Sequence, residues 1–293
     1  MPDSELGQVQ WGQARKLGVV RGWLLALTPL SFLLLLAAAL VAGLDGARLP
    51  AEIRWNGDHW QVASRSGALK AGDEILEIYG RPVTFATLLG DPVQLRSRQE
   101  LGHYLREKTV LYPALKSARL HIQVLRHGRV LPLEVTPTRY SWTQWVGQAW
   151  VELLPACVFL WAGWTTLARA PDRRPSFWFC LMCLLTACCY LASVPFRHGA
   201  FLPPQLLLLF LGVNLVSFVT GPAVLLHVTL LLPEPRVSRG FLALLYSLVV
   251  IVVLSWEVPV LVAVVGTLYA AVLLAVVQAT WRYRASVHRQ QMK

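Results

Sequence analysis

Long apolar runs recur along this chain of 293 residues, and they constrain its fold more than any other feature. A helix needs about 20 predominantly apolar residues to cross the hydrocarbon core of a bilayer. Charged residues make up only 15% of the chain, whereas soluble domains carry about 25%. The sequence therefore predicts an α-helical multispan membrane protein with six transmembrane helices, at residues 22–43, 145–168, 176–194, 205–232, 240–255 and 259–280.

The first run could be a cleaved signal peptide or an uncleaved anchor. The apolar part of a signal peptide is shorter, and residues 44–48 form a poor A-x-A cleavage site. We therefore interpret residues 22–43 as an anchor. The fifth run is short, and the segment 256–259, which ends in Pro259, is typical of a tight hairpin into the sixth.

Positive charge predicts the orientation of the spans, because Lys and Arg accumulate in short cytoplasmic segments. Twelve Lys and Arg residues lie in the two chain ends and in the loops after the second and fourth spans. On the opposite side, the short loops carry only Arg197. This asymmetry places both termini in the cytoplasm. It also accounts for most of the net charge of +11, so we predict no nucleic-acid partner.

Residues 47–140 differ from the rest, because short apolar runs alternate there with turn residues and charges. Asn-Gly-Asp at 56–58 lies between two short apolar runs, which is typical of a hairpin. A second hairpin is predicted at 119–135, with its turn at 127–129. Residues 74–78 indicate a half-buried strand, and 99–108 an amphipathic helix with Leu101 and Leu105 on one face. The segment is predicted to be an inserted β-rich domain.

The run Ser-Gly-Ala-Leu-Lys-Ala-Gly-Asp-Glu-Ile-Leu-Glu-Ile-Tyr-Gly-Arg-Pro-Val, at 66–83, resembles the central motif of PDZ domains. Glycine suits the turns on either side of the strand, and the isoleucines suit the core. The resemblance implies a PDZ-like domain whose core-motif residues are Gly67, Leu69, Gly72, Asp73, Ile75 and Gly80.

PDZ domains add an extended peptide to a sheet edge and hold its carboxylate in a glycine-rich loop. The sequence has no such loop before the motif, and residues 60–63 stand near its place. Two alternatives remain open: a domain that binds peptides, and a PDZ-like sensor or spacer that does not.

We find no catalytic machinery in the sequence. The H-E-x-x-H and G-x-S-x-G motifs are absent, and so are paired intramembrane aspartates, phosphate-binding glycine loops and metal-ligand spacings. All five cysteines lie inside predicted spans, where we interpret them as small buried apolar residues. The sequence thus predicts no catalytic residue, no metal site and no cofactor.

Polar residues inside spans are costly and therefore candidates for function. Glu152 lies about two turns into the second span, and Asn214 and His227 lie along the fourth. The alternative for each is a hydrogen bond between helices, which is worth about 0.6 kcal/mol on average. We predict that Glu152, Asn214 and His227 take part in signal sensing.

Residues 225–235, Leu-Leu-His-Val-Thr-Leu-Leu-Leu-Pro-Glu-Pro, resemble a signature of multispan sensor regions in bacterial signalling proteins. The tail at 286–293 resembles the segment that follows in sensor histidine kinases of the competence-pheromone receptor (ComP-like) type. In that family an anchor, an extracytoplasmic PDZ-like domain and a helical bundle precede a cytoplasmic kinase. Here no phospho-acceptor helix or ATP-binding domain follows, so the chain would be a sensor histidine kinase only if it continued beyond Lys293.

The resemblance implies the membrane sensor module of a bacterial signal-transduction receptor of the two-component type. It would lie in the inner membrane, detect a peptide or small hydrophobic signal, and relay it to an output domain elsewhere. The main alternative is a non-catalytic PDZ-containing adaptor that recruits envelope proteins; a homodimer is left open. The expected division is a cytoplasmic tail (1–21), an anchor (22–43), an extracytoplasmic PDZ-like domain (47–140), a five-helix sensor bundle (145–280) and a basic cytoplasmic tail (281–293).

Overall fold

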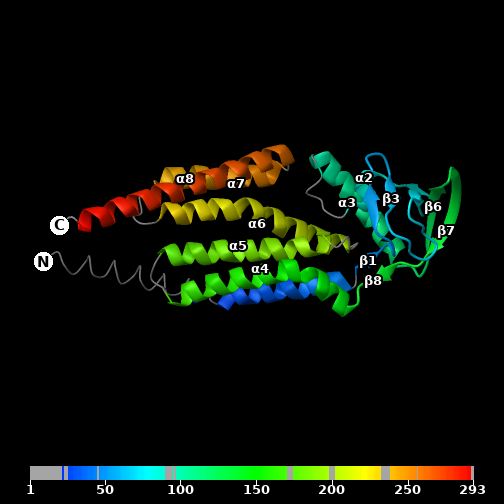
Figure 1. Ribbon diagram of the computed structural model, residues 1–293, viewed down its shortest axis with the longest axis horizontal. Helices are drawn as coiled ribbons and strands as arrows, with labels where there is room; N and C mark the ends of the chain where they lie inside the picture. Colours follow the sequence, from blue (N-terminus) through cyan, green and yellow to red (C-terminus); the bar gives the residue numbers. More distant parts are fainter. Residues whose placement is uncertain are drawn as a thin grey trace. The chain divides into compact units, whose positions relative to one another are not determined.

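A computed structural model describes residues 22, 26–44, 46–89, 95, 97–169, 174–197, 202–231, 238–255 and 257–291 (Figure 1). The chain divides into two compact units, which are considered separately below. The first comprises residues 1–36, 153–191 and 213–293, and the second comprises 37–152 and 192–212. The predicted N-terminal tail, the Pro-Glu-Pro end of the sensor signature and most of the loop after the second span lie outside the described residues.

Among the described residues, five helices are long and apolar enough to cross a membrane. A further helix, α7 (Arg239–Ser255), is apolar but has only 17 residues. At 1.5 Å per residue it spans about 26 Å, slightly less than the hydrocarbon core of about 30 Å. Six spans therefore stay a prediction. The five long helices are Ala26–Leu44, α4 (Trp142–Arg169), α5 (Arg174–Arg197), α6 (Pro204–Leu230) and α8 (Val258–Gln291).

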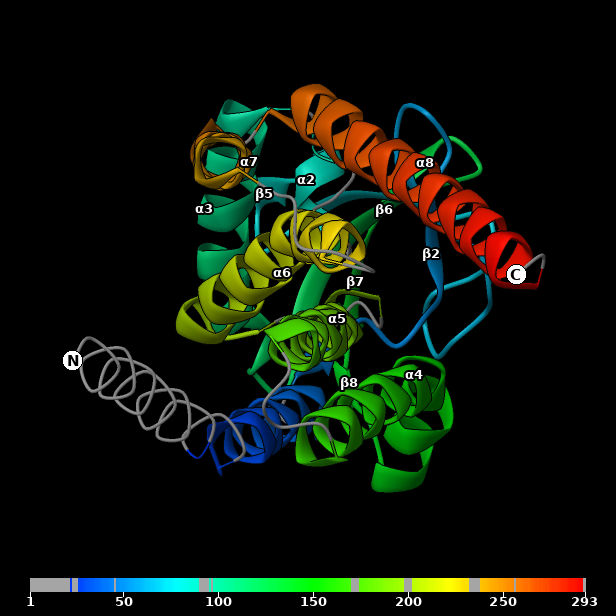
Figure 2. The ribbon, with the colours of Figure 1, turned by 90° about the vertical axis from the view of Figure 1, so that its left-hand side faces the viewer.

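An apolar core joins α6, α7 and α8 in the first unit (Figure 2). Its residues recur every three or four positions on each helix, so each helix presents one stripe to the others. They are Val219, Ala223 and Leu226 on α6, Leu245, Val249 and Val252 on α7, and Leu261, Val265, Leu268 and Val272 on α8.

Helices α4 and α5 approach closely at Gly163. A Cβ atom at this position would lie 2.6 Å from Cys183 Cβ and 3.2 Å from Cys180 Cα. Small residues allow membrane helices to pack at such short range. Cys180 and Cys183 are buried and serve as compact packing residues, as the sequence predicts. The prediction is wrong for Cys157, which is exposed on α4, and Cys188 and Cys189 are only half-buried.

The β-rich segment lies wholly within the second unit. Its main sheet has the strand order β2-β3-β4-β6-β7, with β5 paired to β4, and a separate ribbon joins β1 to β8. The elements are β1 (Ala47–Arg48), β2 (Ile53–Trp55), β3 (Trp60–Val62), β4 (Glu74–Ile78), β5 (Arg81–Pro82), α2 (Phe85–Leu88), α3 (Arg98–Leu115), β6 (Leu120–Arg126), β7 (Arg129–Val135) and β8 (Thr138–Arg139).

Both predicted hairpins are present. Strands β2 and β3 pair in antiparallel register around the Asn-Gly-Asp turn, and β6 pairs with β7. The β6–β7 turn has positive φ at both central residues, 50° at His127 and 75° at Gly128. Positive φ at both positions is typical of the type I′ turn, whose twist matches that of the flanking strands.

The predicted strand at residues 74–78 forms, but its inward side chains are three positions apart. Ile75 and Ile78 are both only 1% exposed, whereas strict alternation would place them on opposite faces. The register shifts between Ile75 and Glu77 where β4 pairs with β6. This bulge turns both isoleucines into the core.

Helix α3 is longer than the predicted helix at 99–108, because it continues through Pro113 to Leu115. Its buried face also differs from the expected one: Leu101 and Leu105 are only half-buried. The residues that point into the core follow one another at intervals of three or four, and they are Tyr104, Lys108, Leu111 and Leu115.

The two ends of the β-rich segment are held together where they meet the membrane helices. Strand β1 pairs with β8, and the Arg48 guanidinium lies 3.7 Å from the centre of the Tyr140 ring. Gly43 packs directly against the buried Trp145 indole, with no room for a Cβ atom. The β1–β8 ribbon and the Gly43–Trp145 contact therefore connect the end of helix Ala26–Leu44 to the start of α4.

Candidate functional site

A buried polar cluster joins three helices of the first unit. His227, on α6, is only 4% exposed, and its Nδ1 atom lies 3.0 Å from the Tyr246 hydroxyl on α7. The indole of Trp178, on α5, lies against the imidazole with ring centres 4.2 Å apart and ring planes tilted by 44°. We define His227, Tyr246 and Trp178 as the intramembrane cluster.

Apolar side chains surround the cluster. Met182, Cys183, Val224 and Val228 are buried there, and both Trp178 and Tyr246 pack against them. In apolar surroundings a hydrogen bond is strengthened, and losing the Tyr246 hydroxyl would leave the buried His227 without this partner. The His227–Tyr246 contact thus ties α6 to α7 specifically.

Asn214 makes a second polar link, between α6 and α5. Its side-chain amide nitrogen donates to the Cys189 carbonyl over 3.1 Å and lies 3.8 Å from the Cys189 sulfur. Asn214 and His227 are thirteen residues apart on α6, so they lie at different heights. For Asn214, the structure thus shows a hydrogen bond between helices, the alternative to a sensing role that the sequence left open.

Glu152, the third predicted sensing residue, is 3% exposed on α4 and belongs to the second unit. Asn214 and His227 belong to the first. Within the first unit, Asn214 and His227 lie thirteen residues apart on one helix, about 20 Å, so they do not share one contact site. Two of them serve separate helix pairs within one unit, and Glu152 is a buried carboxyl group in the other.

The core-motif residues shape turns and the interior of the β-rich segment. Gly67, Gly72 and Gly80 have φ values of 59°, 91° and 70°, a region that favours glycine. Leu69 is fully buried.

Asp73 is the charged member of this motif, and it is 1% exposed. Its carboxylate receives two hydrogen bonds from Arg126, at 2.7 and 2.6 Å, and one from the Lys70 backbone at 2.8 Å. The Arg126 hydrogen bonds lower the pKa of the Asp73 carboxyl, although burial opposes this effect. Arg126 also donates to the Ala68 carbonyl. The Asp73–Arg126 ion pair therefore holds the turn before β4 against the end of β6.

Strand β2 leaves one edge of the main sheet open among the described residues. Asn56 and Glu52 bond through their backbones to the β3 side of the hairpin, at His59 and Ala63. Because bonding directions alternate along an antiparallel strand, the backbone groups of Ile53 and Trp55 point to the open edge.

The opposite edge, β7, is less suited to pairing. Pro132 stands opposite Gln123, three residues beyond the pair Arg126–Arg129 that closes the two-residue turn. Along an antiparallel strand the backbone groups of successive residues point alternately toward the partner strand and away from it, and Arg129 points toward β6. Pro132, three residues on, therefore points outward, where proline offers no N–H donor. Proline at such a position protects an edge strand against further pairing.

Beside β2, three aromatic rings form a compact group. The Trp55 ring centre lies 5.5 Å from that of Trp60 and 5.2 Å from that of Phe85, at the start of α2. The Trp60 indole N–H donates to the Thr84 carbonyl over 2.9 Å, which fixes its orientation. An extended chain added at β2 would lie next to an aromatic surface.

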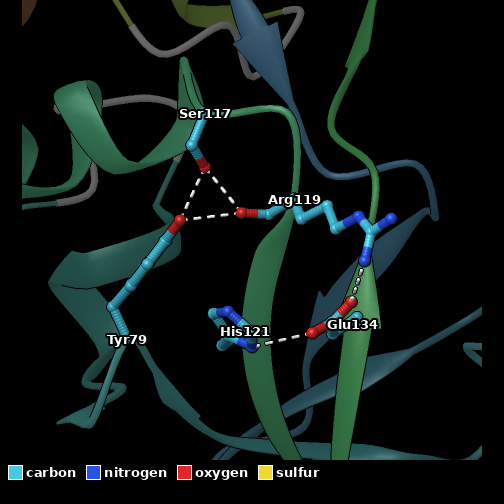
Figure 3. Close-up of polar contacts among 5 residues, drawn as sticks. All are labelled: Tyr79, Ser117, Arg119, His121 and Glu134. Atoms are coloured by element: carbon cyan, nitrogen blue, oxygen red, sulfur yellow. Dashed lines mark hydrogen bonds and ion pairs between the residues drawn. The ribbon is translucent and has the colours of Figure 1, made fainter.

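A polar network links the β4–β5 turn to β6 (Figure 3). Tyr79, with φ of 53°, has its hydroxyl 2.6 Å from the Ser117 hydroxyl and donates to the Arg119 carbonyl over 2.7 Å. The Glu134 carboxylate lies 3.1 Å from the Arg119 guanidinium and 3.6 Å from His121. The serine and the histidine thus belong to separate pairs, so the network ties loops together rather than forming a nucleophile–base pair.

Sequence reasoning missed Tyr246, Trp178 and Arg126. Tyr246 interrupts an otherwise aliphatic run, and a phenol there needs a buried partner, which is a readable signal. Arg126 gave no comparable signal, because an arginine at the end of a strand is ordinarily solvated. Among the described residues, no group of three or more His, Cys, Asp or Glu side chains could hold a metal ion.

Comparisons with protein-family models, with curated proteins and with solved structures found no match for the chain. The long apolar helices and the small sheet are compatible with a multi-pass helical membrane protein that carries a β-rich segment.

Proposed function

We propose that this chain is the membrane sensor module of a bacterial signal-transduction receptor of the histidine-kinase type. In this proposal six helices cross the inner membrane, both termini are cytoplasmic, and a PDZ-like domain lies outside. The module detects an extracytoplasmic or membrane signal and relays it to a cytoplasmic output domain. The sheet order and the buried core motif support the PDZ-like assignment.

The hydrogen bond between His227 and Tyr246 is the observation that carries the proposal. It is a specific, breakable link between α6 and α7 in an apolar region. Both helices share their core with α8, so a shift of one against the other repacks α8 as well.

Helix α8 is suited to pass such a shift onward. It runs unbroken for 34 residues, whereas its apolar, membrane-spanning window ends at Gln278. The remaining part therefore continues as helix into the basic C-terminal segment. A ligand can shift the helix bundle between two arrangements only if it binds one arrangement more tightly than the other.

A test compares cells that lack the gene with cells complemented by the wild-type chain, His227→Asn or Thr186→Val. Thr186 is the matched control, because its hydroxyl bonds within α5, to the Met182 carbonyl, and to no other helix among the described residues. Transcript levels are followed after osmotic shift and after addition of defined peptides or medium-chain fatty acids. The proposal predicts a response that is lost with the gene, restored by wild type and Thr186→Val, and altered by His227→Asn at normal abundance. Identical responses with and without the gene would exclude it.

The open edge of β2 favours a second candidate, an adaptor that recruits envelope proteins. Exposed backbone groups at Ile53 and Trp55 suit strand addition by an extended segment of a partner. Such capture requires no movement of the membrane helices, which separates it from the sensor.

The adaptor is tested with defined fluorescent peptides of alternating apolar sequence, bound to the full chain in nanodiscs. Ile53→Pro removes an outward N–H group and keeps the backbone atoms that bond β2 to β3, so it is expected to abolish binding while leaving the β2–β3 bonds in place. Gln123→Ala, on β6, is the control on a strand that is paired on both sides. Binding that survives Ile53→Pro would exclude the edge as the docking site.

A further inference from the structure

A groove of about 470 Å³ lies between β5 and the outward side of α3 in the β-rich segment. The groove is shallow and largely open to solvent. The groove plays no part in either candidate function above. It is lined by Arg81, His103, Leu105, Arg106, Glu107, Thr109 and Val110.

Positive charge dominates this groove. Among the described residues, the Arg81 side chain makes no hydrogen bond or ion pair, and the Arg106 side chain uses only its Nε atom, which donates to the Gly102 carbonyl over 3.2 Å. Glu107 is the only carboxylate in the lining, so two guanidinium groups outnumber it. The free N–H groups of arginine match the oxygens of a phosphate or carboxylate.

The rest of the lining is largely apolar. The Val110 side chain is 40% exposed, and Leu105 is half-buried beside it. His103 is turned toward Thr84, with its Nε2 atom 3.5 Å from the threonine hydroxyl. The groove thus combines cationic groups with an accessible aliphatic surface.

We propose that this groove binds an anionic amphiphile. Arg81 and Arg106 hold its phosphate or carboxylate head, and its aliphatic chain lies along Leu105 and Val110. The site does not depend on the signalling proposal, because either a sensor or an adaptor could carry it.

The test uses the full chain in nanodiscs of neutral lipid and three probes. Dihexanoyl phosphatidate has head and chains, dihexanoyl phosphatidylcholine has the same chains with a zwitterionic head, and inorganic phosphate has the head alone. Hydrogen exchange of the α3 amides is followed during each titration, with empty nanodiscs as the blank. We expect phosphatidate to slow exchange in α3 and to bind at least about tenfold more tightly than either other probe.

The double variant Arg81→Gln/Arg106→Gln is expected to weaken phosphatidate binding at least about tenfold. Arg65→Gln/Arg129→Gln, which removes two exposed arginines outside the groove, is expected to bind as the wild type does. Equal binding of phosphatidylcholine would overturn the role of the charge, and equal binding of phosphate would overturn the role of the chain. Unchanged affinity in the groove variant, or no binding of phosphatidate, would overturn the site.

Discussion

Asp73 and Arg126, 53 residues apart in sequence, form a two-point ion pair, with Nε to Oδ1 at 2.7 Å and Nη2 to Oδ2 at 2.6 Å. The carboxylate side chain is 1% exposed and the guanidinium side chain 16%. Two parallel hydrogen bonds give such a pair directional specificity. The pair therefore fixes the turn before β4 against the end of β6.

Removing one partner is predicted to destabilise the β-rich segment, because the other charge stays largely buried. Asp73→Asn is expected to lower its unfolding midpoint by roughly 5 °C or more, measured by thermal unfolding of the full chain in nanodiscs. Glu134→Gln is the control, since that exposed carboxylate pairs with Arg119 at the surface, where ion pairs contribute little. Equal losses in both variants would contradict the role of the pair.

The same pair sets an acid limit on stability. Arg126 holds the pKa of Asp73 below its ordinary value of 3.8. A carboxyl group with a lowered folded-state pKa contributes stability that is present above pH 3.8 and is lost as pH falls through the folded-state pKa. In Asp73→Asn, the free energy of unfolding is expected to fall less steeply as the pH is lowered from 5 to 2, measured by chemical denaturation. An equally steep fall in the variant and the wild type would contradict this role of Asp73.

Lys108 is predicted to destabilise the segment near neutral pH. Burial lowers its pKa from 10.5 to about 7, so between these values the folded chain binds fewer protons than the unfolded chain. Stability therefore rises with pH across that interval. Lys108→Met should stabilise α3 at pH 6, by on the order of 5 kcal/mol, and have a much smaller effect at pH 10.5.

Hydrogen exchange of the α3 amides, corrected for the intrinsic effect of pH, measures this difference. Lys116→Met is the control, because Lys116 is exposed. A gain from Lys108→Met that is the same at both pH values would show that burial of the ammonium group is not its cause.

Gly163 is predicted to be essential for the α4–α5 contact. Gly163→Ala places a methyl group 2.6 Å from Cys183 Cβ, and overpacking of this kind costs about 1–3 kcal/mol. Gly221→Ala, on α6, is the matched control, since a Cβ atom added there would meet nothing within 4 Å. The temperature at which the protein aggregates in detergent should fall for Gly163→Ala and stay unchanged for Gly221→Ala. A larger fall for Gly221→Ala than for Gly163→Ala would refute the close contact.

The topology prediction rests on the distribution of Lys and Arg in the sequence. Reporter fusions should place position 100 outside and positions 172, 236 and 290 in the cytoplasm. A cytoplasmic reporter that is active at position 100 would contradict this orientation.

Local patterns in the sequence predicted the features that depend on neighbouring residues. Asn-Gly and His-Gly marked two hairpin turns, and length with hydropathy marked the long helices. The bulge in β4 depends on its pairing with β6 and left no local trace. The PDZ-like assignment and the six spans stay predictions.

The candidate site was less accessible to sequence reasoning, because its contacts join distant segments. His227 was recognised as a polar residue in a span, but its partner Tyr246 lies on another helix. Lysine is rarely fully buried, so nothing in the pattern pointed to the burial of Lys108.

In the proposed sensor, the His227–Tyr246 link governs the state of α8. Hydrogen exchange of residues 279–291 in nanodiscs measures this state, in wild type, Tyr246→Phe, His227→Asn and the control Thr186→Val. We predict at least a roughly twofold change in exchange of this segment in the first two variants, with the β-rich segment and Thr186→Val unchanged. Exchange of residues 279–291 that is identical in all four chains would contradict the account.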